Sequence, residues 1–247
     1  QKVFENDKDK LFNIYLFGDE NSIIDKTEKD NKQIKDLFKI MRGIETIAKQ
    51  VISDTKTEKS KKILLGKQNL ARYSIKNYKF IEYNPKQKKD YKNEDILNSQ
   101  KIIIPEGASV LMPIYDSEGF WITRSLYALV SQKINLKYVV GLLNSKLYLF
   151  YTNKKIKGNV GYTKIRIAHV ENIPIKIPTK PQEQKITSLV DQMLELQKKY
   201  HMEDSSGNEK ERLEQQIKNI DYEIDQEVYK LYEITPEEQK IIEESLK

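Results

Sequence analysis

The chain has 247 residues with no cysteine and two histidines, and its 43 Lys and Arg residues against 37 Asp and Glu residues give a net charge of +6. A chain without cysteine has no disulfide framework, thiolate metal site or Cys nucleophile, and two histidines are too few for a His-rich metal cage. No stretch is apolar enough for a membrane span or a signal peptide. We therefore expect a cytoplasmic protein that does not bind membranes.

The net charge is unevenly distributed along the chain. Residues 1–60 carry 12 basic and 12 acidic side chains, residues 61–180 carry 22 and 8 (net +14), and residues 181–247 carry 9 and 17 (net −8). No Asp or Glu occurs between Gly119 and Val170. A general preference for Lys would not remove the acids over so long a run. The asymmetry therefore predicts that one face meets a polyanion, with nucleic acid as the leading partner.

Short apolar runs separated by Gly, Pro and Asp indicate strands in the first half of the chain. Ile34–Arg42 begins as a helical turn and continues as a strand that ends at Gly43. Several strands at short spacing predict a mixed or antiparallel sheet. The other predicted strands are Leu11–Phe17, Lys61–Leu65, Tyr78–Tyr83, Ile102–Ile104, Val110–Tyr115, Phe120–Thr123 and Tyr127–Val130.

Helical periodicity begins after Asn135, which can cap a helix from Leu136 to about Tyr151. A Lys/Gly loop and a strand-like segment, TKIRIAHVENIPIKIP, follow. Thr179 and Gln182 fit a capping box at the start of a long helix. Residues 213–231 repeat apolar side chains at steps of three and four, which predicts an antiparallel helical hairpin. The sequence TPEE from residue 235 predicts the start of a further helix.

Common catalytic motifs are missing from the sequence: GxxxxGK[ST], GxGxxG, GxSxG and HExxH do not occur. The two ExK strings, at residues 183–185 and 238–240, lie near predicted helix starts and are interpreted as ordinary helix charges rather than parts of a nuclease site. His169 is interpreted as a strand histidine rather than a general base. We therefore assign no catalytic residue and no metal ligand to this chain.

Two loops carry groups that suit DNA. Thr152–Thr163 together with Lys164 offers four positive side chains, and Tyr162 can stack on a base; a mobile, solvated loop is the alternative. In LLGKQNLARY, Gln can pair with adenine and Arg with guanine through two hydrogen bonds each. We predict phosphate contacts from the central lysines. The predicted base-reading residues are Gln68, Arg72, Tyr162, Lys164 and Arg166.

Five strings occur in an order that resembles a known family. Together they resemble the C-terminal target recognition domain of type IIG restriction-modification enzymes, also called the TaqI-like specificity domain, which is similar to the specificity subunits of type I systems. The resemblance covers Leu37 to Glu244, and Ile47 replaces the second Gly of the family's RGIxTG turn. The strings are MRGIETIAKQVI, LLGKQNLARY, YVVGLLNSKLYLFY, ENIPIKIPTKPQEQKITSLVDQMLELQKK and IDQEVYKLYEITPEEQKIIE.

The resemblance implies an α+β domain that binds duplex DNA and selects the sequence for a separate adenine methyltransferase or endonuclease in a prokaryotic cytoplasm. The family's NPP[YF] and FxGxG motifs are missing, so S-adenosylmethionine and Mg²⁺ are implied only for catalytic domains outside this chain. We predict a lead-in at 1–36, a recognition domain with a mixed or antiparallel sheet at 37–180, and a helical hairpin and C-terminal helix at 181–247 that dock on a methyltransferase domain or subunit. The candidate DNA-binding residues are Arg42, Thr46, Lys67, Gln68, Arg72, Tyr73, Arg124, Lys154, Lys155, Lys157, Asn159, Tyr162, Lys164 and Arg166.

Three other functions stay open on the sequence. The chain could belong to a phage-defence system that methylates without cutting. It could be a coiled-coil interaction module whose basic middle binds an acidic protein. A stand-alone nuclease is the third alternative, and the missing catalytic pattern speaks against it.

Overall fold

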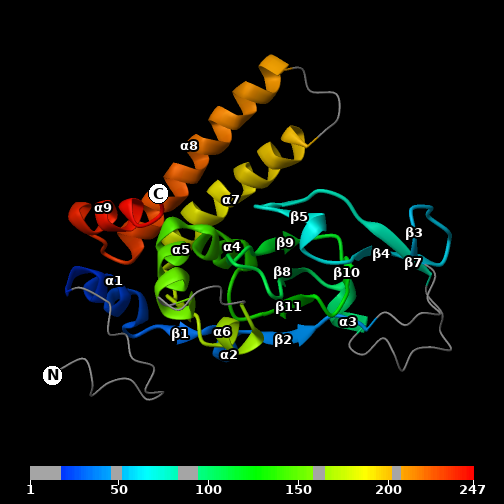
Figure 1. Cartoon of the computed structure of the whole chain (residues 1–247), viewed down its shortest axis with the longest axis horizontal. Helices are drawn as coiled ribbons and strands as arrows, with labels where there is room; N and C mark the ends of the chain where they lie inside the picture. Colours follow the sequence, from blue (N-terminus) through cyan, green and yellow to red (C-terminus); the bar gives the residue numbers. More distant parts are fainter. Residues whose placement is uncertain (1–17, 46–51, 83–93, 158–164, 202–206) are drawn as a thin grey trace.

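The computed structural model describes residues 18–45, 52–82, 94–157, 165–201 and 207–247. They form an α+β fold in which two four-stranded sheets are followed by a long helical hairpin (Figure 1). The predicted fold class is confirmed. The predicted strand Leu11–Phe17 lies outside the described residues, and the predicted division of the chain at residues 36 and 180 stays a prediction.

An antiparallel sheet forms the middle layer of the molecule, with strand order β2-β11-β8-β9. Side chains alternate between the two faces of a strand, so Ile102 and Ile104 of β8 join one core while Ile103 joins the other. All five residues of β8 are buried because both faces of the sheet are covered. The strands are β2 (Lys39–Arg42), β8 (Lys101–Pro105), β9 (Ile114–Asp116) and β11 (Leu126–Val130).

The second sheet has the order β10-β4-β7-β3, and it packs against the first through a core that includes Trp121, Ile63 and Leu97. Strands β10 and β4 are parallel, and the other two pairs are antiparallel. The short helix α3 (Glu94–Asn98) also contributes to this core. The strands are β3 (Ile52–Ser53), β4 (Ser60–Leu64), β7 (Lys79–Glu82) and β10 (Trp121–Ile122).

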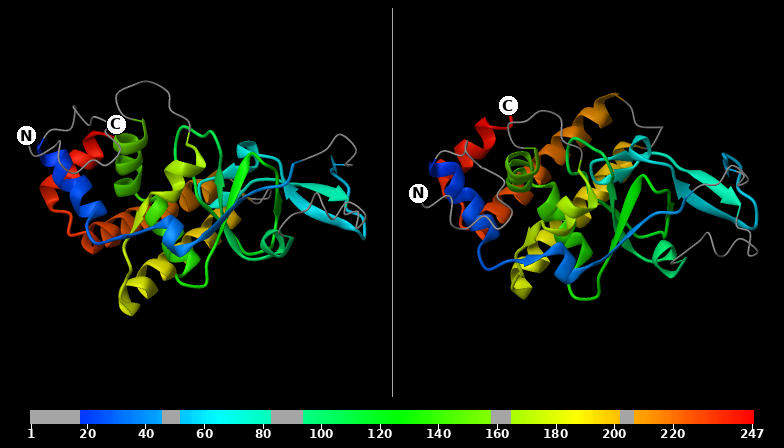
Figure 2. Two further views of the ribbon diagram at one scale, coloured as in Figure 1. Left: turned by 90° about the horizontal axis from the view of Figure 1, so that it is seen from below. Right: turned by 60° about the horizontal axis from the view of Figure 1, so that its bottom comes forward.

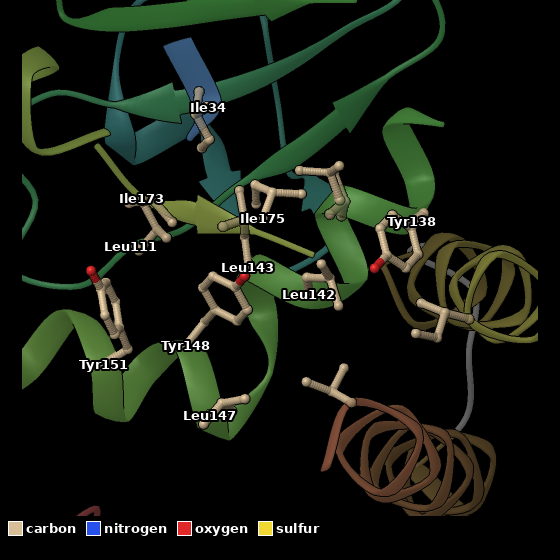
Figure 3. Close-up of a cluster of buried hydrophobic side chains, with 14 of the residues drawn as sticks. Ile34, Leu111, Tyr138, Leu142, Leu143, Leu147, Tyr148, Tyr151, Ile173 and Ile175 are labelled. Carbon is tan, nitrogen blue, oxygen red and sulfur yellow. The ribbon is translucent and has the colours of Figure 1, made fainter. Parts of the chain in front are cut away.

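Helices cover the opposite face of the middle sheet. Figure 3 shows Tyr138, Leu142 and Leu147 of this layer beside Ile173 and Ile175 in one buried cluster. A Cβ at Gly141 would lie 2.8 Å from the side chain of Ile186, so the helix axes approach closely there. The hairpin of α7 and α8 extends beyond the sheets (Figure 1). The helices are α4 (Leu136–Asn144), α5 (Lys146–Thr152), α7 (Lys180–Tyr200) and α8 (Gly207–Leu231).

The first described helix, α1 (Gly18–Glu28), packs beside the last one, α9 (Pro236–Glu244), as both views in Figure 2 show. Glu238 accepts hydrogen bonds from Lys26 at 2.7 Å and from Ser22 at 2.9 Å. An ion pair across 212 positions and a hydrogen bond across 216 positions of the sequence thus join the two helices. The chain then continues through β1 (Lys32–Gln33), which pairs with β12 (Pro174–Ile175), and the turn α2 (Ile34–Leu37).

Two predicted elements need correction. The helix expected from Leu136 to Tyr151 is two helices, because Ser145 has an extended backbone and caps both: its hydroxyl donates to Leu142 O at 2.7 Å and accepts from Tyr148 N–H at 3.4 Å. The strand-like segment after residue 163 contains the helical turn α6 (Ile167–Glu171), whose start is closed by Arg166 N–H donating to His169 Nδ1 at 3.1 Å. His169 is therefore not a strand histidine.

The strand prediction at 110–115 is also only partly right, because β9 begins at Ile114. The remaining predicted strands within the described residues are confirmed, with boundaries within about two residues, as is the Thr179 capping box. The predicted antiparallel hairpin of α7 and α8 and the final helix α9 are present.

A fully buried ion pair ties β8 to β9. Lys101 Nζ lies 2.6 Å from Asp116 Oδ2, and both side chains are completely inaccessible. Lys101 also donates to Leu97 O at 2.7 Å, and Asp116 accepts the backbone N–H groups of residues 118–120. Burial lowers the pKa of Lys101, while the neighbouring carboxylate opposes that effect. The polar groups of this pair are thus satisfied without water.

Candidate nucleic-acid interface

Strand β4, strand β10 and the segment after β2 run parallel to one another and end at one edge of the molecule. Strands β4 and β10 pair in parallel through Ile63 and Trp121, and Ile44 forms a parallel bridge with Thr123. Thr123 also donates its hydroxyl to Leu65 O at 2.7 Å. Because parallel segments end on the same side, the residues that follow them come to one edge.

Close packing at this edge requires a glycine after β2. A Cβ at Gly43 would lie 2.2 Å from Ile122 O and 2.3 Å from Thr123 O, distances that no side chain tolerates. Gly43 N–H donates to Leu126 O at 3.0 Å, and Ile44 N–H donates to Ile122 O at 2.8 Å. The residues on either side of Gly43 are thereby held against β10 and β11.

Three of the chain's five arginines lie at this edge. Arg42 donates from Nε to Arg124 O at 2.9 Å and forms an ion pair with Glu106. Arg124 pairs with Glu45 at 2.5 Å, and the two side chains are 65% and 72% exposed. We call this group, with the exposed Arg166, the arginine edge: Arg42, Glu45, Glu106, Arg124 and Arg166.

Arg166 joins the arginine edge through the backbone beside it. Gly107 N–H donates to Ile165 O at 3.0 Å, and Ile165 N–H donates to Ala108 O at 3.2 Å. Gly107 has a φ of +69°, which suits glycine in this turn. Arg166 therefore emerges next to the turn that carries Glu106.

Glu106 and Tyr127 are site residues that the sequence reasoning missed. The Tyr127 hydroxyl donates to Glu106 Oε1 at 2.7 Å, and the hydrogen bond from Arg42 is the main cause that holds the pKa of Glu106 below its ordinary value. Burial and the bond to Glu106 raise the pKa of Tyr127 to about 12. A turn glutamate and a strand tyrosine carry no sequence signal for this role, because only their partners reveal it.

The Lys67–Asn69 turn, η2, opens directly after β4. Lys67 and Gln68 are exposed, and the Gln68 amide folds back over Gly66. Asn69 is buried and shapes the turn: its Oδ1 accepts from Leu65 N–H at 2.8 Å and from Gly66 N–H at 3.2 Å. Asn69 is a third residue that the sequence reasoning missed, although Asn in a turn is a recognised local signal.

Arg72 and Tyr73 form the turn between β5 (Leu70–Ala71) and β6 (Ser74–Ile75). Tyr73 is 2% exposed, and Arg72 pairs with Asp221 of α8 at 2.5 Å. Burial raises the pKa of Tyr73. Both candidate residues therefore contact the helical layer, away from the exposed side chains of η2.

Lys154 and Lys155 lie on the π-helical turn η4 (Asn153–Lys157), which extends α5. Lys154 pairs with Glu20 at 2.6 Å and Lys155 with Glu28 at 3.1 Å, so both contact helix α1. The side chain of Lys157 and the residues Thr46, Asn159, Tyr162 and Lys164 lie outside what the structure describes. DNA contacts by all of these residues stay predictions.

Residues 61–175 match the TaqI-like C-terminal specificity domain family. The predicted resemblance is confirmed. The matching segment begins in β4 and ends at β12, so it includes Lys67, Arg124 and Arg166, whereas Arg42 precedes it. A search of curated protein sequences finds no match.

Solved structures show a similar fold. A chain of MmeI, a type IIL restriction-modification enzyme in complex with DNA, matches with a TM-score of 0.55 and 11% identity over 84% of this chain and 34% of that chain. A chain of a type I restriction-modification system matches with a TM-score of 0.48 and 11% identity over 87% and 50%. The HsdS subunit from Thermoanaerobacter tengcongensis gives 0.46 and 11% over 86% and 49%. This chain spans half or less of the length of each.

No group of three or more His, Cys, Asp or Glu side chains among the described residues is placed to hold a metal ion. None of the helices in the described part of the chain combines the length and apolar composition that crossing a bilayer requires.

Proposed function

We propose that this chain selects the duplex DNA sequence on which a type IIG restriction-modification enzyme acts. The observation that carries the proposal is the arginine edge, where Arg42, Arg124 and Arg166 lie together beside the exposed Lys67 and Gln68 turn. Arginine binds phosphate and guanine through paired N–H groups. The match to a specificity-domain family supports the same function.

The arginine edge can exchange its own partners for DNA. Arg124 and Glu45 are both more than half exposed, and such pairs contribute about 0–1 kcal/mol to stability. Phosphate can therefore replace Glu45 at little cost. Arg42 forms an ion pair with Glu106 and donates a hydrogen bond to the Arg124 carbonyl. These two contacts fix the orientation of the Arg42 side chain before DNA binds.

Catalysis would belong to methyltransferase and endonuclease parts outside this chain, in a prokaryotic cytoplasm. Those parts would bind S-adenosylmethionine and Mg²⁺, and no step of their chemistry falls on the residues described above. The acidic helices α7–α9 would dock on them, since their net charge of −8 over residues 181–247 disfavours DNA. Copurification with the methyltransferase part tests this contact: Tyr222→Ser, on the exposed side of α8, should weaken it, and Tyr78→Ser, at the residue before β7, should not.

Binding of fluorescent duplexes with random centres, measured over a series of salt concentrations, tests the function. We expect log K to fall linearly with log salt, and repeated selection to enrich one sequence. Replacing both Arg124 and Arg166 by Ala should lower the slope by about 2, whereas Arg212→Ala on acidic α8 should leave it unchanged. No binding at low salt, or a flat slope, would refute the proposal.

The lysines of η4 allow a second test. Lys154 and Lys155 are paired with Glu20 and Glu28, so neutralising those carboxylates with Gln frees two positive charges. If the lysines bind phosphate, the double Gln variant should bind all sequences more tightly and to the same degree. Tighter binding of one sequence alone would contradict a phosphate role.

A further inference from the structure

We propose that Arg72 is a positioning residue that clamps the β5–β6 hairpin to helix α8 and thereby holds the Lys67–Gln68 turn in place. The guanidinium Nη1 donates to Asp221 Oδ2 at 2.5 Å, and Nη2 donates to Asn144 O at 2.6 Å. Asn144 is the last residue of α4, whose final carbonyls have no partner within the helix. One side chain therefore joins the hairpin to two helices. The part of this inference that concerns DNA rests on the proposed function.

The turn itself is shaped for this contact. Tyr73 has a φ of +59°, a backbone region that a bulky residue rarely occupies and that costs on the order of 1 kcal/mol or more. Its ring is buried in the helical core, and the Arg72 guanidinium lies 5.1 Å from the ring centroid. The strand residue Leu70 packs instead in the core between the sheets. The hairpin thus spans both cores, with its turn inserted into the helical one.

The clamp acts on the η2 turn because residues 65–77 form one hydrogen-bonded unit. Lys76 N–H donates to Asn69 O at 2.8 Å, and the Asn69 amide donates to Asn77 at 2.6 Å. Asn69 also accepts from Leu65 and Gly66, as described above. A shift of the β5–β6 turn would therefore move Lys67 and Gln68.

The helix side of the contact is polar and specific. Asp225, one turn after Asp221, accepts from Lys146 N–H at 2.8 Å, and Lys146 Nζ pairs with Glu243 of α9 at 2.9 Å. We call this group the joint: Arg72, Tyr73, Asn144, Lys146, Asp221 and Asp225. The Arg72 and Asp221 side chains are 40% and 25% exposed, whereas Asn144 and Asp225 are buried. Their directional polar contacts fix one arrangement, whereas apolar contact alone would allow the elements to slide.

Exchange of the two charges separates positioning from base reading. We expect Arg72→Asp and Asp221→Arg each to reduce, at least tenfold, the ratio of affinities for the selected and random duplexes. The double exchange should restore most of the lost ratio, because the pair re-forms with its charges reversed. If residue 72 reads a base itself, the double variant will be no better than Arg72→Asp, and this result would overturn the proposal.

Two further measurements distinguish positioning from a direct phosphate contact, and test the clamp without DNA. Arg72→Lys, which cannot hold both acceptors, should lower the affinity ratio while the salt slope stays constant; a slope reduced by about 1 would show a phosphate contact and refute the positioning role. Urea unfolding reports the clamp without DNA: the double exchange should unfold at a higher midpoint than either single variant. If the wild-type chain binds no duplex, the proposed function fails while unfolding still tests the clamp.

A matched control uses the pair Lys137–Asp191, which has the same 2.5 Å separation and similar exposure but joins α4 to α7. Reversing these two charges, singly or together, should leave the affinity ratio unchanged. An equal loss of the ratio at both pairs would show general loosening of the helical layer and would overturn the specific role of Arg72.

Discussion

Arg124 of the arginine edge and Arg72 of the joint have different surroundings. Arg124 and its partner Glu45 are both well exposed, and under the proposed function the pair would open to accept phosphate. Arg72 is held by Asp221 and by a helix carbonyl, among buried polar groups that include the Tyr73 hydroxyl. Under the proposed function, exposure and partners, rather than residue type, decide whether a positive side chain is available for DNA.

The largest effect should come from the backbone that supports the arginine edge. Gly43→Ala places a Cβ within 2.3 Å of two carbonyl oxygens, so β2 must move away from β10. We expect a loss of about 4–5 kcal/mol in the free energy of unfolding, measured with urea. Gly18→Ala, where nothing lies within 4 Å, is the control and should change stability little. A small loss at Gly43 would show that this contact is not rigid.

Loss of the lysine should lower stability far more in the buried pair Lys101–Asp116 than in the exposed pair Lys62–Glu118, although the two acids are two residues apart. Lys101→Met leaves Asp116 charged and without its cation in the core, which should lower the free energy of unfolding by about 3–4 kcal/mol. Lys62→Met removes the partner of Glu118, whose exposed pair should contribute below about 1 kcal/mol. Equal losses in thermal or urea unfolding would contradict the role given to burial.

The joint should make stability depend on pH through Asp225. Burial is the main cause that raises its pKa from 3.8 to about 6, so the protonated carboxyl favours the folded state, and this stabilisation is lost as pH rises through about 6. Asp225→Asn should therefore match the wild type below pH 4 and be more stable at pH 7 by about 3 kcal/mol at most.

The charged neighbours of Asp225 belong to three segments and must be kept constant in this comparison. Lys146 and Arg72 favour its ionised form, and Asp221 opposes it. Unfolding measured from pH 4 to pH 8 gives the difference curve. Ile220→Val on the same helix removes no ionisable group, so its stability difference should not vary with pH. A flat curve for Asp225→Asn would show that solvent reaches the carboxylate.

The smallest effect on stability should accompany a clear effect on DNA. Arg124→Ala removes an exposed pair, so we expect a change below about 1 kcal/mol in unfolding. In the same variant, affinity for the selected duplex should fall about tenfold and the salt slope by about 1. A stability loss as large as that of Lys101→Met would show instead that Arg124 mainly stabilises the fold.

Most elements of the fold could be predicted because their patterns are local. The β-branched run at 102–104, the cap at Asn135 and the apolar steps of α8 each act within a few residues. Two predicted elements were wrong where the hydrogen bonds of one side chain changed the local backbone conformation. Ser145 capped two helices inside one apolar stripe, and His169 closed a helical turn in an alternating segment.

The candidate site was predictable by residue type and not by arrangement. Arg42, Arg124 and Arg166 were each expected to contact DNA, but they lie 82 and 42 positions apart in the sequence. The parallel pairing of β4 and β10, the bridge at Ile44 and the close approach at Gly43 bring Arg42 and Arg124 together. The backbone hydrogen bonds of Ile165 with Gly107 and Ala108 bring Arg166 to the same edge.

The sequence by itself determined the charge asymmetry, the α+β class and the family resemblance, since these depend on composition, periodicity and short strings. Tertiary structure decided which basic side chains pair with a carboxylate from a distant element. Lys154, Lys155 and Arg72 look alike as basic residues in a sequence, yet each meets a carboxylate from a distant helix. The strength of an ion pair depends on distance and solvent exposure, and both are set by folding.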